Sequence, residues 1–285
     1  MEQSGFSRPE ISLQGTLSES AFLVNALRSR DEAISRDGYA YLWVTEEVQK
    51  ITQEYMAAMG HYDGVELALR SRFFLECMER FECCHPEGYF INLGAGFTSY
   101  PYLLKQESKW IEVDLPEVTS WKRVEVERFI REGVLPTRTV KYLSCNLNSP
   151  EGIDDLQNNL DSIMQGSPSF VLLEGVSYYL ERSCFEYLLK MLSMVQAPGS
   201  FLALDYWQPS LSQSEQIRRL RRFFASHFSQ DEQDYTFIDS SFFCSLDGYL
   251  VVEQTDAPQL HCRYYHEANL DVSATLAEHY VLLKT

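Results

Sequence analysis

The sequence predicts an α/β fold built on a largely parallel β-sheet. From residue 88 onward, short apolar runs alternate with helix-like stretches, which is the pattern of buried strands joined by helical crossovers. Between residues 18 and 84 the periodicity is helical, and no strand pattern interrupts it. We therefore expect an N-terminal helical cap or lid over residues 1–87 and a sheet domain over residues 88–285, forming one integrated unit.

The elements of the first 205 residues follow from local patterns. Residues 18–84 are expected to form three helices, broken at Asp37-Gly38 and between Gly60 and Gly64, because glycine favours turns over helix interiors. The strands are predicted at residues 89–93, 109–113, 139–144, 169–173 and 200–204, and the helices between them at 117–132, 151–164 and 182–197.

The rest of the chain is predicted to form one helix and then antiparallel strands. The helix covers roughly residues 211–229. Strand-like pieces follow at residues 235–238, 248–254, 260–265 and 278–284, with a turn at Asp247-Gly248 and a break at Ala257-Pro258.

The composition is that of a soluble enzyme or binding protein. The chain of 285 residues is 45% hydrophobic and carries 24 Lys and Arg against 41 Asp and Glu, a formal charge of −17. Nucleic-acid binding depends on basic residues that neutralise phosphates, so we expect no nucleic-acid partner. The seven cysteines lack metal-ligand spacing and indicate reduced thiols without a metal. With no signal-peptide pattern and no apolar run near the roughly 20 residues of a membrane span, a cytoplasmic location is expected.

The most specific local pattern is a glycine turn followed at a distance by an acid. A predicted strand runs into Gly94-Ala95-Gly96, and the next strand ends at Asp114, 20 positions after Gly94. Glycines let the main chain approach a ligand closely, and an acid at this distance can accept both hydroxyls of a ribose. The pattern predicts a pocket for a nucleoside cofactor. It leaves nicotinamide, flavin and S-adenosylmethionine cofactors open.

Polar and aromatic side chains follow the next two strands. Asn146 and Leu147 come after the third strand, and the Asn146 carbonyl oxygen can accept a hydrogen bond from an adenine amino group. Glu174 directly follows the fourth strand and needs a ligand or a basic partner if it is buried. Tyr178 and Tyr179 come shortly afterwards. Because parallel strands end at one edge of the sheet, we expect these residues to line the same crevice.

Together these segments resemble the leucine carboxyl methyltransferase family, in particular its bacterial branch of small-molecule O-methyltransferases. The resemblance covers most of residues 16–207, and its motifs are Asp37-Gly38-Tyr39-Ala40, Leu69-Arg70-Ser71-Arg72-Phe73, Ile91-Asn92-Leu93-Gly94-Ala95-Gly96, Trp110-Ile111-Glu112-Val113-Asp114-Leu115-Pro116 with Lys122 beyond it, and Glu174-Gly175-Val176 followed by Tyr179-Leu180. The resemblance implies a class I methyltransferase fold, with a Rossmann-like seven-stranded sheet, an antiparallel C-terminal hairpin and S-adenosylmethionine as the cofactor.

The resemblance also implies roles for individual residues. Those expected to bind the cofactor are Arg70 at the methionine carboxylate, Gly94 and Gly96 close to the same moiety, Glu174 near the amino-acid end, Asp114 at the ribose, and Asn146 with Leu147 at the adenine. Tyr178 and Tyr179 are expected to orient the methyl acceptor, and Tyr179 is favoured because it matches the family's tyrosine. In the cap, aromatic walls are expected from Phe22, Tyr41, Trp43 and Tyr55.

Three departures distinguish this chain from the family pattern. Asn146 stands where the family usually has Asp, and Gly38 stands where it has Pro. After the glycine turn, residues 97–100 read Phe-Thr-Ser-Tyr in place of Asp-Thr-Arg, which leaves a more aromatic and neutral wall. Substrate preference is therefore expected to differ from that of close relatives.

The predicted function is methyl transfer from S-adenosylmethionine to a carboxylate or hydroxyl oxygen of a small molecule, such as a polyketide-like or other secondary metabolite. A carboxylate acceptor is already ionised, whereas a hydroxyl needs proton removal, with which Glu174, His261 or His266 could assist. No histidine is assigned a catalytic role. The alternatives are methylation of a protein's C-terminal leucine carboxylate, a non-catalytic S-adenosylmethionine-binding scaffold, and a nicotinamide oxidoreductase. A monomer or homodimer is expected.

Overall fold

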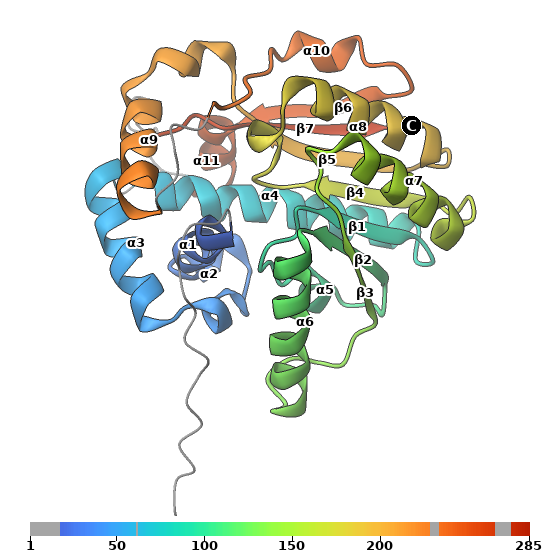
Figure 1. Ribbon diagram of the computed structural model, residues 1–285, viewed down its shortest axis with the longest axis horizontal. Coiled ribbons are helices and arrows are strands. Elements are labelled where there is room, and N and C mark those ends of the chain that lie inside the picture. The colour runs from blue at the N-terminus through green and yellow to red at the C-terminus, as the bar shows by residue number, and fades with distance from the viewer. Residues whose placement is uncertain (1–17, 61, 229–233, 266–274) are drawn as a thin grey trace, which may run out of the picture.

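The computed structural model describes residues 18–60, 62–228, 234–265 and 275–285, and its centre is a seven-stranded sheet with helices on both faces (Figure 1). The strands are β1 (Tyr89–Leu93), β2 (Lys109–Asp114), β3 (Val140–Ser144), β4 (Ser169–Leu173), β5 (Phe201–Tyr206), β6 (Leu250–Asp256) and β7 (His279–Lys284). Their order is β3-β2-β1-β4-β5-β7-β6, and in this sheet β7 is the strand that runs antiparallel to its neighbours. The predicted fold class is confirmed.

Helices precede, connect and follow the strands. They are α1 (Ser18–Ser29), α2 (Glu32–Ser35), η1 (Ala40–Trp43), α3 (Glu46–Met59), α4 (Tyr62–Cys84), α5 (Tyr100–Leu103), α6 (Pro116–Arg131), α7 (Pro150–Met164), η2 (Ser177–Tyr179), α8 (Arg182–Val195), η3 (Pro209–Gln213), α9 (Glu215–His227), α10 (Ser241–Cys244) and α11 (Ala257–Tyr265). Local chemistry sets several of their starts. The side chains of Thr45, Ser149 and Ser214 each accept a hydrogen bond from the main-chain N–H three residues later, as N-caps do.

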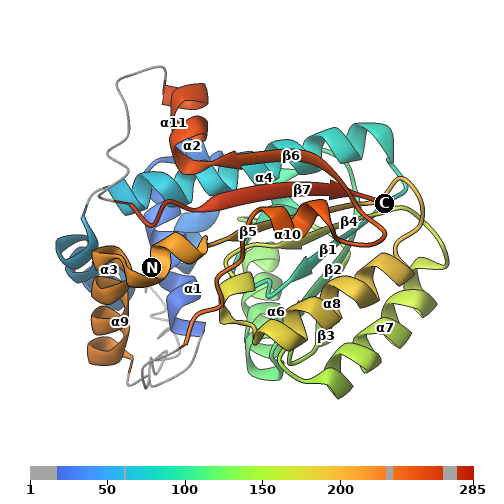
Figure 2. The same ribbon diagram turned by 90° about the horizontal axis from the view of Figure 1, so that it is seen from above.

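The two faces of the sheet are covered by different helices (Figure 2). Alternate residues of a strand point to opposite faces, so Ile91 and Leu93 pack with α7, α8 and α10, whereas Phe90 packs with α4, α5 and α11. All five residues of β4 are buried, which explains why a parallel strand covered on both faces reads as a continuous apolar run.

Helices α1, α3 and α9 lie together at the left of Figure 1, beyond the carboxyl ends of the parallel strands. Their apolar residues form one cluster with Tyr178 and Trp207, which follow β4 and β5. The long helix α4 joins this cluster to the sheet, because its first half contacts α1 and α3 and its second half packs on β4 and β5. The division of the chain at residue 87 stays a prediction.

One predicted strand is absent because its main chain bonds elsewhere. Residues 235–238 form no strand. The main-chain N–H of Thr236 donates to the carbonyl of Tyr178 over 3.0 Å, and that of Ile238 donates to the carbonyl of Trp207 over 2.8 Å. Tyr235 is buried against Tyr178 and Trp207, which follow β4 and β5, and Ile238 is buried in the cluster on one face of the sheet, so the apolar pattern reflects packing rather than strand pairing.

A second predicted strand, residues 260–265, belongs to helix α11. Ala257, Leu260 and His261 are buried at helical spacing against α4, and Pro258 lies in the first turn, where its missing N–H costs nothing. Strands β6 and β7 do pair antiparallel, but α11 lies between them in the chain. The helix predicted at 211–229 is divided into η3 and α9 by the Ser214 cap, and residue 229 lies outside the described residues.

Within the described ranges, no helix combines the length and the apolar character that crossing a bilayer requires.

Candidate functional site

A cavity of about 220 Å³ opens at the carboxyl ends of the parallel strands, under α1 and the start of α4. Its lining includes every residue that the sequence singled out for a binding or orienting role, namely Arg70, Gly94, Gly96, Asp114, Asn146, Leu147, Glu174, Tyr178 and Tyr179. These residues come from five segments of the chain. Four of the segments meet because β1 to β4 are parallel and their carboxyl ends share one edge of the sheet, and helix α4 brings Arg70 to the same edge.

The glycine turn is tied to the neighbouring strand by its main chain. Gly94 and Gly96 have φ values of +68° and +44°, which glycine adopts without strain. The N–H groups of Gly94 and Ala95 both donate to the carbonyl of Val113, over 2.8 and 3.1 Å. The turn therefore presents its main chain to the cavity, and Gly94 and Gly96 have no side chains that would keep a ligand away from it.

Asp114 is held by main-chain donors on both of its oxygens. Gly96 N–H donates to Oδ2 over 2.7 Å, and Leu115 N–H donates to Oδ1 over 2.7 Å. Burial raises the pKa of Asp114, while these two donors favour the ionised form. Each carboxylate oxygen keeps further lone-pair capacity, so the side chain can still accept hydrogen bonds from a vicinal diol such as a ribose.

Replacing Gly94 by alanine is expected to destabilise the protein more than the backbone strain alone explains. A Cβ at Gly94 would lie 2.3 Å from Val176 Cγ2. Gly133 is a matched control, because its φ is +73° and a Cβ there meets nothing within 4 Å. We expect Gly94→Ala to lower the free energy of unfolding by about 1–3 kcal/mol more than Gly133→Ala in urea titrations. Adding Val176→Ala should recover this difference, and equal losses in the two single variants would contradict the account.

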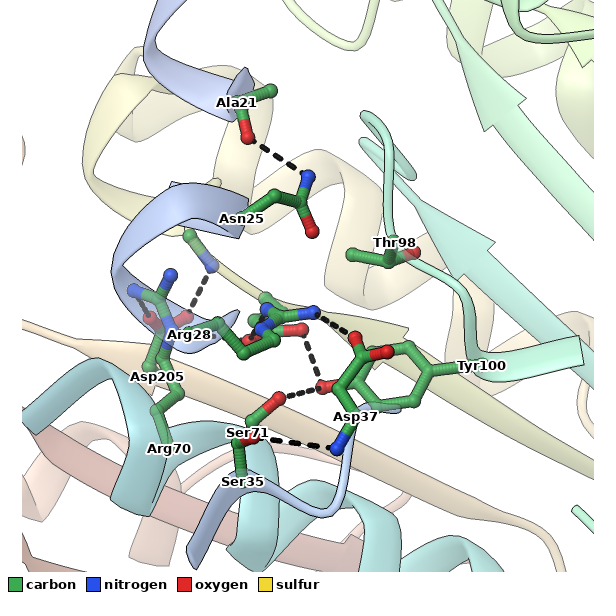
Figure 3. Close-up of polar contacts among 12 residues, drawn as sticks. Ala21, Asn25, Arg28, Ser35, Asp37, Arg70, Ser71, Thr98, Tyr100 and Asp205 are labelled. Carbon is green, nitrogen blue, oxygen red and sulfur yellow. Dashed lines mark hydrogen bonds and ion pairs between the residues drawn. The ribbon is translucent and has the colours of Figure 1, made fainter. Parts of the chain in front are cut away.

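Glu174 belongs to a buried ionic network, and Figure 3 shows its partners Arg28, Arg70 and Tyr100. Its Oε1 accepts hydrogen bonds from Arg28 Nη2 over 2.7 Å and from Arg70 Nε over 3.1 Å, and its Oε2 accepts from the Tyr100 hydroxyl over 2.7 Å. Burial alone would raise the pKa of Glu174, but the two guanidinium groups hold it below its usual value. The sequence predicted that a buried acid at this position needs a ligand or a basic partner, and the structure provides two basic partners, Arg28 and Arg70.

Arg70 is bonded mainly to protein carboxylates. Its Nη1 lies 3.0 Å from both Asp205 Oδ2 and Glu278 Oε1, in addition to the Nε contact with Glu174. Within the described chain, Nη2 makes no hydrogen bond, and it lies beside Gly175, where a Cβ would approach it to 3.4 Å. A ligand carboxylate predicted to pair with Arg70 would therefore have this nitrogen as its donor.

Arg28 and Asn25 of α1 are functional candidates that the sequence analysis missed. Both are buried and line the cavity, and Figure 3 shows them one turn apart on the same helix. Arg28 also reaches Asp37 Oδ2 at 3.3 Å. Among the described residues, Arg28 Nε and Asn25 Oδ1 have no hydrogen-bond partner, although buried polar atoms are normally paired. A single arginine and a single asparagine in a helix gave no signal in the sequence.

Asn146 and Leu147 lie at the end of β3 with different surroundings. Leu147 is buried, whereas Asn146 is exposed and its Oδ1 accepts a hydrogen bond from the Asn148 N–H over 3.0 Å. This contact is a local turn, and the oxygen that was predicted to meet adenine has one lone pair left for it. Asn148 connects this loop to the next one, because its Nδ2 donates to the Tyr179 carbonyl over 3.0 Å.

The remaining part of the cavity is an apolar space that we call the aromatic chamber. Its walls are Tyr55, Leu67, Tyr178, Tyr179, Trp207, Leu220, Phe224 and Leu276. Tyr178 stacks on Trp207, with ring centroids 3.8 Å apart and an interplanar angle of 3°. Burial raises the pKa values of both tyrosines, which keeps their hydroxyls neutral.

Of the four cap aromatics proposed as walls, Tyr55 lines the cavity. Phe22 and Trp43 pack instead against Phe97 and the helix α6, and Tyr41 is 56% exposed. Their pattern in the sequence is the same as that of Tyr55, so only the packing of the helices separates the two groups.

Asp63, at the start of α4, is a buried acid that lines the chamber. It accepts a hydrogen bond from the Tyr55 hydroxyl, and burial raises its pKa from 3.8 to about 6. Because the folded state then holds the proton more tightly, the wild type loses stability as the pH rises from about 4 to about 6. We expect Asp63→Asn to gain up to about 3 kcal/mol of unfolding free energy relative to the wild type over this window. Urea titrations of both proteins at pH 4.5 and 7 test this, and a constant difference would refute it.

Solved structures share the whole fold at low sequence identity. A candidate methyltransferase from Thermobifida fusca has a TM-score of 0.65 and 14% identity, and the match covers 96% of both chains. A DUF574 family protein from Streptomyces avermitilis has a TM-score of 0.63 and 12% identity, over 93% of this chain and 97% of that one. At these identities the likeness concerns the fold.

The fold and the match to a family model define a methyltransferase as the class of protein. The chain belongs to the leucine carboxyl methyltransferase family, whose model matches residues 21–193. The nicotinamide and flavin alternatives are thereby set aside. A candidate S-adenosylmethionine-dependent methyltransferase of Mycolicibacterium smegmatis is 29% identical over 131 residues, which are 45% of this chain and 42% of that protein. The chain thus matches less than half the length of this curated relative.

Proposed function

We propose that the protein transfers the methyl group of S-adenosylmethionine to an oxygen atom of a small, largely apolar molecule, such as a polyketide-like or other secondary metabolite. The observation that carries this proposal is the aromatic chamber, which continues the cavity beyond the glycine turn and Asp114. Its walls suit a flat or aliphatic acceptor better than a polar polymer.

The residues present fit the cofactor. Bound S-adenosylmethionine supplies an activated methyl group on a sulfonium, which needs no covalent enzyme intermediate. We propose that Arg70 and Arg28 bind the methionine carboxylate of the cofactor, that Glu174 lies near its amino-acid end, and that Gly94 and Gly96 allow close approach of the main chain to the same moiety. Asp114 is assigned to the ribose, and Asn146 with Leu147 to the adenine. The unpaired atoms of Asn25 and Arg28 support this fit, because a ligand would supply their missing partners.

The protein's task in such a transfer is to align the reacting atoms and exclude water. In the chamber, Tyr178 and Tyr179 carry neutral hydroxyls that can orient an acceptor oxygen by hydrogen bonding. Their rings and the stacked Trp207 exclude solvent from the same space. We therefore assign these tyrosines to orientation of the acceptor.

Label transfer tests the proposal. The purified protein would be incubated with methyl-labelled S-adenosylmethionine and a small-molecule extract of the producing cells, and products would be analysed by mass spectrometry. We expect one labelled product from the wild type and, at a cofactor concentration near the wild-type dissociation constant, severalfold less of it from Asp114→Ala. Mild alkali would release the label from a methyl ester but not from an ether. Absence of cofactor binding in calorimetry, or label on nitrogen, would refute the proposal.

Methylation of a protein's C-terminal leucine carboxylate is the alternative that the family description itself suggests. A phosphatase C-terminal peptide incubated with the same labelled cofactor separates the two, because a small-molecule enzyme leaves the peptide unlabelled. The third candidate, a non-catalytic scaffold, predicts cofactor binding without any labelled product.

The proposal includes a cytoplasmic monomer or homodimer without a nucleic-acid partner, and light scattering after size exclusion would measure the oligomeric state.

A further inference from the structure

Asp63 occupies the end of the cavity away from the strand ends. Asp63, Leu67 and Arg70 are spaced by four and three residues on α4, so they form one stripe of the helix, and all three line the cavity. At about 1.5 Å of rise per residue, Asp63 lies about 10 Å along the helix axis from Arg70. Arg70 marks the end of the cavity at β4 and β5, so Asp63 belongs to the aromatic chamber. Figure 1 shows this end of α4 beside α3 and α9.

The burial of the Asp63 carboxylate is energetically costly in its surroundings. This cost favours a functional role for the side chain. It is 3% exposed, and its hydrogen bond comes from Tyr55, a neutral donor on α3. Leu67 and Leu276 line the cavity near it. Among the described residues, no Lys, Arg or His forms an ion pair with it. A buried carboxylate without a cationic partner is unfavourable, and asparagine would bond to Tyr55 at lower cost.

The charges along the cavity disfavour an acceptor that carries a carboxylate, in addition to the methionine carboxylate of the cofactor. Four acids line the cavity, Asp63, Asp114, Glu174 and Glu278, against two bases, Arg28 and Arg70. Both guanidinium groups are already bonded to Glu174, and Arg70 is also bonded to Glu278. A negatively charged acceptor in the chamber would face Asp63 and Glu278 across a low-dielectric space, where like charges repel strongly. A neutral hydroxyl avoids this repulsion and can donate a hydrogen bond to Asp63.

From this geometry we propose that the acceptor is a neutral phenol or alcohol and that Asp63, positioned by Tyr55, is the base that removes its proton. This inference rests on the proposed function and narrows its substrate class. The acceptor O–H bond breaks and its proton passes to the Asp63 carboxylate. The acceptor oxygen forms a bond to the methyl carbon, and the carbon–sulfur bond breaks with its electron pair going to sulfur, which leaves a neutral thioether. Solvent then takes the proton from Asp63.

The titration of Asp63 suits this role. Burial raises the pKa of Asp63 to about 6, so it is mostly ionised at neutral pH and close to the pH at which a base is most effective. The titratable or charged groups that act on it are Tyr55 from α3, Glu66 and Arg70 from α4, and Glu278 before β7. Arg70 and the Tyr55 hydrogen bond lower the pKa against the effect of burial. Removing the Tyr55 hydroxyl should therefore raise it.

The first test compares two matched probes on the full-length protein saturated with S-adenosylhomocysteine. Calorimetry would measure the binding of 2-naphthol and of 2-naphthoate to the wild type, Asp63→Asn and Glu79→Gln. Glu79 is the control acid, because it lies on the same helix outside the cavity and pairs with Arg36. We expect naphthol to bind the wild type and Glu79→Gln at least tenfold more tightly than naphthoate, and Asp63→Asn to reduce this ratio below threefold.

Tighter binding of naphthoate to the wild type, binding of neither probe, or an unchanged ratio in Asp63→Asn would overturn the inference. The binding of S-adenosylhomocysteine itself should be the same in all three proteins. Failure of the wild type to bind it would count against the proposed function instead, so the two outcomes are distinguishable.

The second test measures methyl transfer to 2-naphthol as a function of pH. For the wild type, kcat/KM should rise with pH to a plateau, with an apparent pKa near 6. Asp63→Asn should lose this rise and lower kcat at pH 7 at least 100-fold, with the KM for S-adenosylmethionine unchanged. Tyr55→Phe should keep the rise but move it to higher pH. Bound naphthol that the wild type does not methylate, or a Tyr55→Phe profile that does not move, would contradict proton removal by Asp63.

Discussion

Replacing Arg70 by methionine is expected to lower the free energy of unfolding by about 3–5 kcal/mol, because it leaves the buried carboxylates of Asp205 and Glu278 without a cation, while Glu174 keeps Arg28. Glu174, Asp205 and Glu278 all lie within 3.1 Å of Arg70 nitrogens, and the side chains of all four residues are at most 2% exposed. Methionine fills a similar length of the site without charge. Urea titration at pH 7.5 would measure the loss, and calorimetry should show weaker binding of S-adenosylmethionine in the same variant.

A surface ion pair provides the control for this prediction. Arg36 binds Glu79 through two hydrogen bonds of 2.9 and 2.6 Å, but both side chains are about one third exposed. Arg36→Met should cost less than about 1 kcal/mol, since solvent screens exposed pairs, and should leave cofactor affinity unchanged. If Arg70→Met cost no more than Arg36→Met, the buried network would not depend on the Arg70 charge.

Asp114→Ala is expected to raise the dissociation constant of S-adenosylmethionine at least tenfold. The substitution removes two hydrogen bonds from ribose hydroxyls to a charged acceptor, each worth about 1.5–3 kcal/mol. It also removes the partner of the Gly96 N–H, which helps to hold the glycine turn. Calorimetry with the purified variant measures the affinity directly.

Asp161→Ala is a suitable control, because this acid is exposed on α7 and does not line the cavity. It should bind the cofactor as the wild type does, and thermal unfolding should show both variants to be folded. An unchanged dissociation constant in Asp114→Ala would remove the ribose assignment.

The central sheet was predictable because buried parallel strands leave a strong local signal. The strands predicted at residues 89–93 and 169–173 have the observed bounds of β1 and β4. Both are covered by helices on two faces, so nearly every residue must be apolar. The predicted helices 117–132 and 151–164 differ from α6 and α7 by one residue at most at either end, since prolines and caps fix their starts.

The later segments were not predictable, because their apolar residues are buried by packing on other parts of the fold without pairing in the sheet. Residues 235–238 contribute buried side chains next to Trp207 while their main chain bonds to loops. Residues 260–265 are short and aromatic, and such a run fits a strand as well as a helix until its packing on α4 is known.

The sequence by itself determined the positions of the strands, the family and the residues that follow the strands, because each of these leaves a pattern within short segments of the chain. The tertiary structure decided which other side chains join them. Arg28, Tyr55 and Asp63 lie on three helices that precede the sheet, and they reach the cavity only through the packing of those helices over the strand ends. Contacts such as Arg28 with Glu174, 146 positions apart, leave no local pattern, so folding alone brings them together.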